Sequence, residues 1–545
     1  MVPHPLAEVQ DVLYSIFSYL DSDLQVADND DVSSELQSDA ARSARHTLAL
    51  LARVHRNFTW PAVTVLWKYL PSDRPLQILA GVHGIAQLLS THTGEGCETG
   101  SCSSICGTGA LKPETHMGWK RFQEYASLVR QIVVDPLVHG NLSISPPGLL
   151  NDSIWHQLTT SVLGCTPILP RLEAVVIKGA VDDDRSFDMG ALSLTNPGIH
   201  KLIIDFTYPQ PLPTVRRQRI QEVLQSAFAV CFSSTPNVEK LTIRSVLPLL
   251  DWKSLPISHV RLCQLKVNTL TSDPTDLLHL ISLPNLEELS CRVAFQTAVY
   301  LEPFRFRKLH TLFVSGSWHS IRDNFLAHVD APQLRALSIQ TGKFPRGAEQ
   351  MPQWSSQYLR TVPAAFPSIT DFSWLCSQMK WVGGAVDTRA TLAELLEPLA
   401  PLRMLRRFSV RFSGPTVVPY SSSDFEWIAD TWPDLEAFTF VLDAIIATRD
   451  INIETVASFA RRCARLRSLR IPQMIFKSTS DTIVDIHSQI PPTLRDLVID
   501  NLFWQMEHEG VDMDEKEPLA TLSLSFPSAN VSLGRITHLP QLSTT

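Results

Sequence analysis

The segment Pro332-Gln333-Leu334-Arg335-Ala336-Leu337-Ser338-Ile339 carries the pattern that decides the fold. The same spacing, Pro-x-apolar-x-x-apolar-x-apolar, occurs in eight copies, which begin at Pro170, Pro197, Pro236, Pro284, Pro332, Pro367, Pro433 and Pro492. Further copies without the proline end at Val267, Val314, Val410 and Ile471. Consecutive copies are about 23–39 residues apart, and a repeat of this length determines the architecture before any single motif does.

Each copy predicts one short strand, because its last two apolar residues are two positions apart and share one face of a strand. The proline fixes its own φ and lacks an N–H, so it ends the preceding helix. The segments between copies are apolar at helical spacing, as at Ile220, Val223, Leu224, Ala227 and Phe228. The repeating unit is therefore strand, loop, helix, loop, and stacked units bury one continuous core.

This pattern resembles leucine-rich repeats over residues 166–530. The resemblance implies an α/β solenoid with parallel strands inside and helices outside. The usual Asn or Cys after each strand is replaced by Ala180, Thr207, Val246 and Ala294, so we expect an irregular solenoid. A generic α/β domain with coincidental strands is the alternative.

The repeats predict a long surface for a protein or peptide partner. We expect mixed charges on it, together with the aromatic residues Phe372 and Trp374. The charged positions are Glu173, Lys201, Glu239, Lys240, Arg335, Arg406, Arg407, Arg467 and Arg495.

Composition narrows the class of protein. The 545 residues are 44% hydrophobic and 19% charged, with a net charge of −8, which is typical of a folded domain. No long basic run occurs, which argues against nucleic acid as a partner. No apolar stretch is long enough to span a bilayer, and the N-terminus lacks a signal-like pattern. We therefore expect no membrane partner and a cytoplasmic or nuclear location.

Residues 1–70 have a different pattern, which predicts three short helices. Val9, Val12, Leu13, Ile16 and Leu20 recur at helical spacing. An acidic insertion is expected over residues 21–41. A second helix follows around Leu48, Leu51, Ala52 and His55, and Pro61 suits the first turn of a third helix. Residues 71–165 are expected to form a helical linker with a flexible loop at 91–112, and 531–545 a C-terminal tail.

These helices resemble an F-box. The resemblance rests on Ile16-Phe17-Ser18-Tyr19-Leu20, on the run from Leu50 to Phe58, and on Pro61 with Leu66-Trp67. An F-box helix usually opens with a Leu-Pro pair, and at the corresponding position this sequence has Glu8 and Val9. The resemblance implies the non-catalytic receptor subunit of a Skp–cullin–F-box ubiquitin ligase, which binds a Skp-family adaptor, through it a cullin, and a protein target. The candidate adaptor-binding residues are Val9, Val12, Leu13, Ile16, Leu20, Leu51, Val54 and Trp67.

The alternative is a scaffold or interaction protein in which the N-terminal helices cap the first repeat. A third option is an enzyme or metal protein centred on a cysteine-containing loop. Cys97, Cys102 and Cys106 lie close to His92, and zinc takes such ligands. Their spacing is loose and the segment is rich in Gly, Ser and Thr, which favours a flexible loop. The sequence contains no nucleophile elbow, no Gly-x-x-x-x-Gly-Lys phosphate-binding loop and no His-Glu-x-x-His zinc-binding helix. We therefore expect no catalytic site, metal or cofactor.

Overall fold

A computed structural model describes most of the repeat strands and the N-terminal helices. The described residues are 12–17, 20, 39–83, 117–134, 155, 167–179, 192, 194–206, 225, 228–245, 261–268, 283–294, 303–323, 325–341, 357–376, 386–387, 391–413, 416–443, 451–477, 493–505 and 516–539. The chain divides into two compact units, Met1–Thr269 (unit 1) and Leu270–Thr545 (unit 2).

Unit 1 contains a parallel sheet whose strands follow chain order. Its strands are β1 (Tyr69–Leu70), β2 (Gln131–Val134), β3 (Ala174–Gly179), β4 (Lys201–Phe206), β5 (Lys240–Ser245) and β6 (Gln264–Val267). Two helices, α5 (Arg74–Val82) and α7 (Met117–Ala126), lie between β1 and β2 in the sequence. The register aligns the apolar repeat positions, so that Val175, Leu202, Leu241 and Leu265 form one row across β3–β6.

Unit 2 repeats this plan with longer strands at its C-terminal end. The parallel strands are β7 (Glu288–Val293), β9 (Thr311–Gly316), β11 (Ala336–Thr341), β12 (Asp371–Cys376), β14 (Arg407–Phe412), β16 (Ala437–Leu442), β17 (Ser468–Lys477), β18 (Asp496–Gln505) and β19 (Asn530–Leu539). Two small pairs, β8 (Phe304–Arg305) with β10 (Val329–Asp330) and β13 (Val386–Asp387) with β15 (Thr416–Val417), lie outside this sheet.

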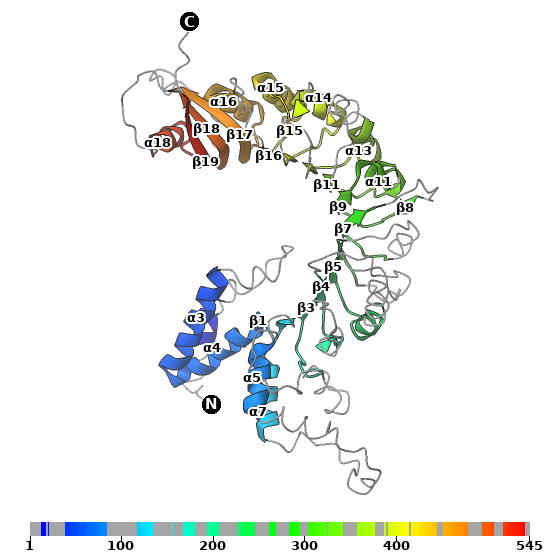
Figure 1. The fold of residues 1–545 in the computed structure, drawn as a ribbon, viewed down its shortest axis with the longest axis vertical. Coiled ribbons are helices and arrows are strands. Elements are labelled where there is room, and N and C mark those ends of the chain that lie inside the picture. Colours follow the sequence, from blue (N-terminus) through cyan, green and yellow to red (C-terminus); the bar gives the residue numbers. More distant parts are fainter. Residues whose placement is uncertain are drawn as a thin grey trace, which may run out of the picture. The chain divides into compact units, whose positions relative to one another are not determined.

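The helices of unit 2 connect successive strands and lie along one side of the sheet (Figure 1). They are α11 (Trp318–Arg322), η5 (Leu326–His328), α13 (Thr361–Ala365), α14 (Leu392–Leu396), η7 (Glu397–Leu399), α15 (Ser422–Thr431), α16 (Ile453–Arg462) and α18 (Lys516–Ser525). Asp424 joins two of them: it completes the capping box of α15 with Ser421 and accepts a hydrogen bond of 2.9 Å from the N–H of Ala393 in α14.

The strand prediction is confirmed for all twelve phrases. Each phrase forms a strand in parallel register with its neighbour, and its last two apolar residues are buried, as Leu337 and Ile339 are in β11. We call the side with these residues the core face. The residues between them, such as Ser338, lie on the other side, the second face. Where the structure describes the connections, helices follow strands as in a leucine-rich-repeat solenoid, as α15 does after β14 and α16 after β16.

Several expected boundaries differ from the structure. The sheet includes β1 and β2, which precede residue 166, and β19, which extends past residue 530. Residues 39–41, expected in the acidic insertion, form the start of α3 (Asp39–Val54). The remaining insertion residues, 21–38, and the expected loop at 91–112 with Cys97, Cys102 and Cys106 lie outside the described residues.

The prediction for Pro61 is wrong, because Pro61 lies inside α4 (Arg56–Lys68) and not in its first turn. Helix α4 begins earlier because His55 is an extended N-cap, whose Nδ1 accepts a hydrogen bond of 3.2 Å from the N–H of Asn57. Phe58, the last residue of the run that resembles an F-box, therefore belongs to α4.

Phe372 and Trp374 are also placed differently from the expectation, because both are buried on the core face. The ring of Trp374 contacts those of Trp318, at 5.6 Å between centroids, and Phe412, at 5.2 Å. These aromatic residues therefore contribute to the stability of unit 2, since buried rings remove a large apolar area from water.

The N-terminal helices pack against the second face of the unit 1 sheet. Residues 12–17 and 20 are helical, and with α3 and α4 they form what we call the helical unit. Its buried side chains share one apolar cluster with Val133, Val176 and Ile203, which lie in one row across β2, β3 and β4. The helical members of the cluster are Leu13, Phe17, Ala41, Ala44, Leu48, Ala62 and Val65.

The connection between the helical unit and the sheet is direct. Helix α4 ends at Lys68 and β1 begins at Tyr69. The carbonyl of Lys68 accepts a hydrogen bond of 2.9 Å from the N–H of Arg130, which immediately precedes β2. The helical unit is thus fixed to the sheet by both main-chain bonds and apolar contacts.

Candidate functional site

The first candidate site is a set of exposed apolar side chains on the helical unit. Val12 and Ile16 are 57% and 51% exposed and lie one turn apart on the first helix. Leu50 and Val54 are 49% and 68% exposed and lie one turn apart on α3. We call these four residues the apolar helical surface. Exposed apolar side chains that recur on a helix are typical of helices that dock onto a partner.

The structure separates the candidate adaptor-binding residues into three groups. Val12, Ile16 and Val54 are exposed. Leu13 is only 8% exposed and belongs to the cluster, and Leu20 and Leu51 are partly buried against that cluster.

The remaining two candidates are Trp67 and Val9. Trp67 is half-buried, and its ring lies 4.8 Å from that of Tyr125 in α7, between centroids. It therefore joins α4 to α7. Val9 lies outside the described residues. Leu50 begins the run that resembles an F-box but is not among the candidate adaptor-binding residues, although its spacing of four residues from Val54 predicts that the two side chains share a helix face.

The second candidate site is the second face of the unit 2 sheet. Its central row consists mainly of small hydroxyl side chains, which lie side by side on neighbouring strands. The row runs through Ser290, Phe313, Ser338, Ser373, Ser409 and Thr439. Phe313, which is half-buried, is the aromatic residue in this row.

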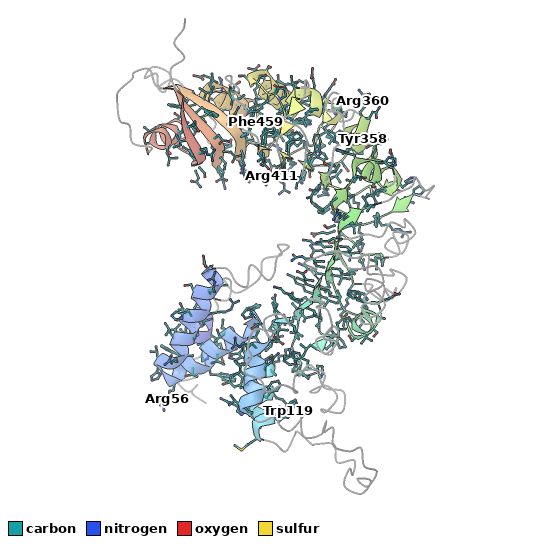
Figure 2. The ribbon with its side chains drawn as sticks, in the orientation of Figure 1. Arg56, Trp119, Tyr358, Arg360, Arg411 and Phe459 are labelled. Carbon is teal, nitrogen blue, oxygen red and sulfur yellow. The ribbon has the colours of Figure 1, made fainter. Side chains whose placement is uncertain are left out.

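Charged pairs cross the strands on this face. Arg407 donates a hydrogen bond to Asp371 on the neighbouring strand, and Arg470 donates one of 2.8 Å to Asp500. Arg411 lies 3.7 Å from a carboxylate oxygen of Asp443. Figure 2 shows Arg411 on the side of the sheet away from Tyr358 and Arg360. Of these charged residues, Arg407 is one of the positions expected from the sequence, and it is paired with an acid on the neighbouring strand.

Two other expected cations have different environments. Arg406 lies 3.5 Å from Glu436, and exposed ion pairs of this kind contribute about 0–1 kcal/mol each. Arg335 is exposed and immediately precedes β11. The surface therefore offers polar recognition groups without one dominant sign of charge in unit 2.

A shallow cavity of about 420 Å³ lies between the helices of unit 2. Its lining residues are Arg360, Pro363, Ala364, Glu397, Pro398 and Pro401. The lining contains no Ser, Thr, Cys, Lys or His side chain. Within the described ranges, no three His, Cys, Asp or Glu side chains form a possible metal cluster. No described helix is both long and apolar enough to cross a membrane.

The chain was compared with known proteins. No protein-family model matches it, and no curated protein matches it. One matching solved structure is the leucine-rich repeat domain of APL1B, with 12% identity and a TM-score of 0.26 over 69% of this chain and 83% of that chain. Another is a protein from Bacteroides fragilis, with 11% identity and a TM-score of 0.27 over 59% and 73% of the two chains. The assignment of the fold rests on the register and burial of this chain's own strands.

Proposed function

We propose that this chain is the receptor subunit of a Skp–cullin–F-box ubiquitin ligase. The helical unit binds a Skp-family adaptor, and the sheet binds a protein target. The observation that carries the proposal is the apolar helical surface, because Ile16, Leu50 and Val54 belong to the segments that resemble an F-box and are left exposed by the chain's own core.

The attachment of the helical unit supports this role. A receptor subunit performs no bond chemistry; it increases the rate of target modification by holding the target in a suitable place and orientation. Helix α4 continues into β1 without an intervening loop, and Ile203 and Val176 pack against the helical unit. An adaptor bound to the helices would therefore have a fixed relation to the sheet of unit 1.

A second candidate function is a non-catalytic scaffold whose helices only cap the sheet. The contact of the helical unit with Val133, Val176 and Ile203 favours it, because a cap must cover apolar sheet surface that would otherwise meet water. The two functions differ in whether the exposed side of the helical unit has a partner.

Co-purification of the whole chain with a Skp-family adaptor separates these functions. Ile16→Asp and Val54→Asp should weaken adaptor binding by at least about tenfold, since a charge in an apolar interface loses its hydration. Val230→Asp is the matched control, because Val230 is an equally exposed apolar residue (56%) outside the helical unit. Its binding should equal that of the wild type.

Circular dichroism should show the same helix and strand content for all three variants. Failure of the wild-type chain to bind the adaptor would reject the ligase proposal and leave the scaffold. Equal loss of binding in Val230→Asp would show that the contact is non-specific.

A further inference from the structure

The sheet of unit 2 ends at an open edge. Strand β19 pairs with β18 on one side, and within the residues that the structure describes no strand pairs with its other side. Figure 1 shows β19 at the C-terminal end of the row of strands. β19 is ten residues long, whereas β16 has six. A long edge strand presents a row of N–H and C=O groups with which another strand can pair.

The main-chain bonds to β18 determine which groups of β19 face the open edge. The N–H of Asn530 donates a hydrogen bond to the carbonyl of Arg495, which immediately precedes β18. In a parallel sheet, successive residues of a strand direct their main-chain groups alternately to its two sides. Val531 and Leu533 therefore direct their N–H and C=O groups toward the open edge.

The apolar side chains of β19 also lack a neighbour at this edge. Leu533 and Ile536 are half-buried, whereas their register partners on β18, Ile499 and Leu502, are completely buried. The two strands differ because β18 lies between two strands and β19 has a strand on one side. An added strand with apolar residues in the same rows would remove this apolar surface from water.

The sequence of β19 has little of the protection that is usual for an edge strand. Natural edges are blocked by charged residues, by proline or by short length. Residues 530–537 contain one charged residue, Arg535, and no proline. Arg535 is exposed and, within the described part of the chain, has no ion-pair partner. An acidic residue on an added strand could therefore pair with it.

We propose that the open edge of β19 binds an extended segment of a partner protein, which adds to the sheet as a parallel strand. The segment continues the apolar rows of Val531, Leu533 and Ile536 and carries an acidic residue beside Arg535. In this mode of recognition, main-chain hydrogen bonds provide affinity and alternate side chains provide specificity. The inference goes beyond the proposed function, which assigns no binding to the end of the sheet, and it holds equally for a scaffold.

A parallel segment fits this edge better than a second copy of the chain. The register skips Pro472, Asp500 and Gly534, which lie at the same place in β17, β18 and β19. A parallel strand can repeat this irregularity. Two copies related by a two-fold axis would pair antiparallel, and alignment of their Gly534 residues would place Leu533 opposite Arg535 of the second copy. The net charge of −8 on each copy would also oppose their association.

Fluorescence anisotropy of the full chain with a labelled peptide tests the proposal. The peptide Ser-Val-Thr-Val-Gly-Glu-Val-Thr, acetylated at its N-terminus and labelled at its C-terminus, copies the spacing of residues 530–537 with glutamate in the place of Arg535. It should bind the wild-type chain. A peptide with lysine in place of glutamate should bind about three- to tenfold more weakly. Failure of the glutamate peptide to bind would overturn the proposal.

Two N-methylated versions of the glutamate peptide separate strand addition from docking by side chains alone. In the proposed register, the first and third N–H groups of the peptide donate to β19, and the second and fourth point away from it. Methylation of the first and third nitrogens should weaken binding at least about fivefold. Methylation of the second and fourth should change it by less than about twofold. Equal effects of the two versions would reject strand addition.

Charge exchange locates the bound peptide. Arg535→Glu should bind the glutamate peptide about three- to tenfold more weakly and the lysine peptide more tightly by a similar factor. The matched control is Arg335→Glu, which reverses an exposed cation beside β11 and should change both affinities by less than about twofold. An unchanged preference of Arg535→Glu for the glutamate peptide would place the peptide elsewhere and overturn the proposal.

Two other occupants of the edge would be recognised by different results. A dimer of the wild-type chain in sedimentation velocity, which the glutamate peptide dissociates, would assign the edge to a second copy. Peptide binding only after deletion of residues 540–545 would assign the edge to the segment that follows β19. Either result rejects the proposal.

Adaptor co-purification of Arg535→Glu distinguishes failure of this inference from failure of the proposed function. The variant should retain the adaptor, because Arg535 does not belong to the apolar helical surface. A chain that binds the peptide and not the adaptor would keep the strand-addition site and lose the ligase role.

Discussion

The indole N–H of Trp155 donates a hydrogen bond of 2.8 Å to a carboxylate oxygen of Asp73, and both side chains are buried. The two residues are 82 positions apart. The same carboxylate oxygen accepts a second hydrogen bond of 2.8 Å from Nε2 of Gln77. Asp73 lies immediately before α5, so this contact fixes the start of that helix to a distant part of unit 1.

Asp73→Ala should lower the free energy of unfolding by about 1–3 kcal/mol, because the buried indole N–H loses this acceptor. Gln77→Ala is the control. It removes the other donor from the same oxygen at a half-buried position and should cost about 0.5–1 kcal/mol. Urea denaturation followed by circular dichroism measures both. A smaller effect for Asp73→Ala than for Gln77→Ala would contradict the assignment of Trp155 as the main partner.

The two glycines Gly316 and Gly81 should respond to the same substitution in opposite directions. Gly316 ends β9 with a φ of 156°, and a Cβ there would lie 2.3 Å from the carbonyl oxygen of Val293 on β7. Gly316→Ala should therefore destabilise the fold by about 1–3 kcal/mol. A Cβ on Gly81, within α5, would meet no atom within 4 Å. Gly81→Ala should stabilise the fold by about 0.5–1 kcal/mol.

The midpoint temperatures of thermal unfolding of Gly316→Ala and Gly81→Ala measure these two predictions. Each variant is the control for the other, since both add one methyl group. An equal midpoint temperature for Gly316→Ala and the wild type would contradict the prediction, because it would mean that β7 and β9 can move apart without a cost in folding free energy.

The reactivity of the cysteine thiols should decrease as their burial increases. Burial raises the pKa of the Cys231 and Cys376 thiols to about 12. Because the thiolate is the reactive form, only about one in 10⁴ of these thiols is ionised at pH 8. Cys263 is partly exposed. Iodoacetamide at pH 8 should therefore alkylate Cys263 well before Cys231 and Cys376.

Mass spectrometry of tryptic peptides measures this order, with urea-denatured protein as the control in which all three thiols react alike. Raising the pH from 8 to 10 should increase the thiolate fraction of Cys231 about a hundredfold while the fold persists. Reaction of native Cys231 at the rate of Cys263 would disprove its burial.

The strands could be predicted from the sequence because their signal is local. A pair such as Leu337 and Ile339, at a fixed distance from Pro332, identifies a strand and its core face without knowledge of the neighbours. Phe372 and Trp374 follow the same rule. Their assignment to a recognition face was wrong because it used their size and aromatic character in place of their position in the repeat.

The candidate site could be predicted only in part, because its geometry depends on contacts between distant segments. Leu13 and Ile16 are both apolar and share the pattern of one amphipathic helix. Leu13 is buried because the helical unit packs on Val176 and Ile203 of the sheet, and Ile16 faces away from that contact. No pattern within the first helix distinguishes the two residues.

The row that contains Ile203 and Thr242 provides a test of how the helical unit is held. Ile203 is buried in the cluster with the helical unit, and the next residue in register, Thr242 on β5, is outside that cluster. Ile203→Thr places a hydroxyl in the apolar contact and should cost about 1–3 kcal/mol. Thr242→Ile makes the reverse change one strand away and should leave the helical unit unaffected.

Hydrogen–deuterium exchange of the α3 amides measures this effect directly, because local opening of the helical unit exposes them to solvent. In Ile203→Thr, exchange in α3 should be about 5- to 100-fold faster, while α16 in unit 2 should keep its rate. Unchanged exchange in α3 would mean that the main-chain bond between Arg130 and Lys68 suffices to hold the helices. Faster α3 exchange in Ile203→Thr, without faster exchange in Thr242→Ile, would show that apolar contact with the sheet holds the helices in place. Ile16 and Val54 lie on these helices, so this contact would also fix the position of the side chains proposed to bind the adaptor.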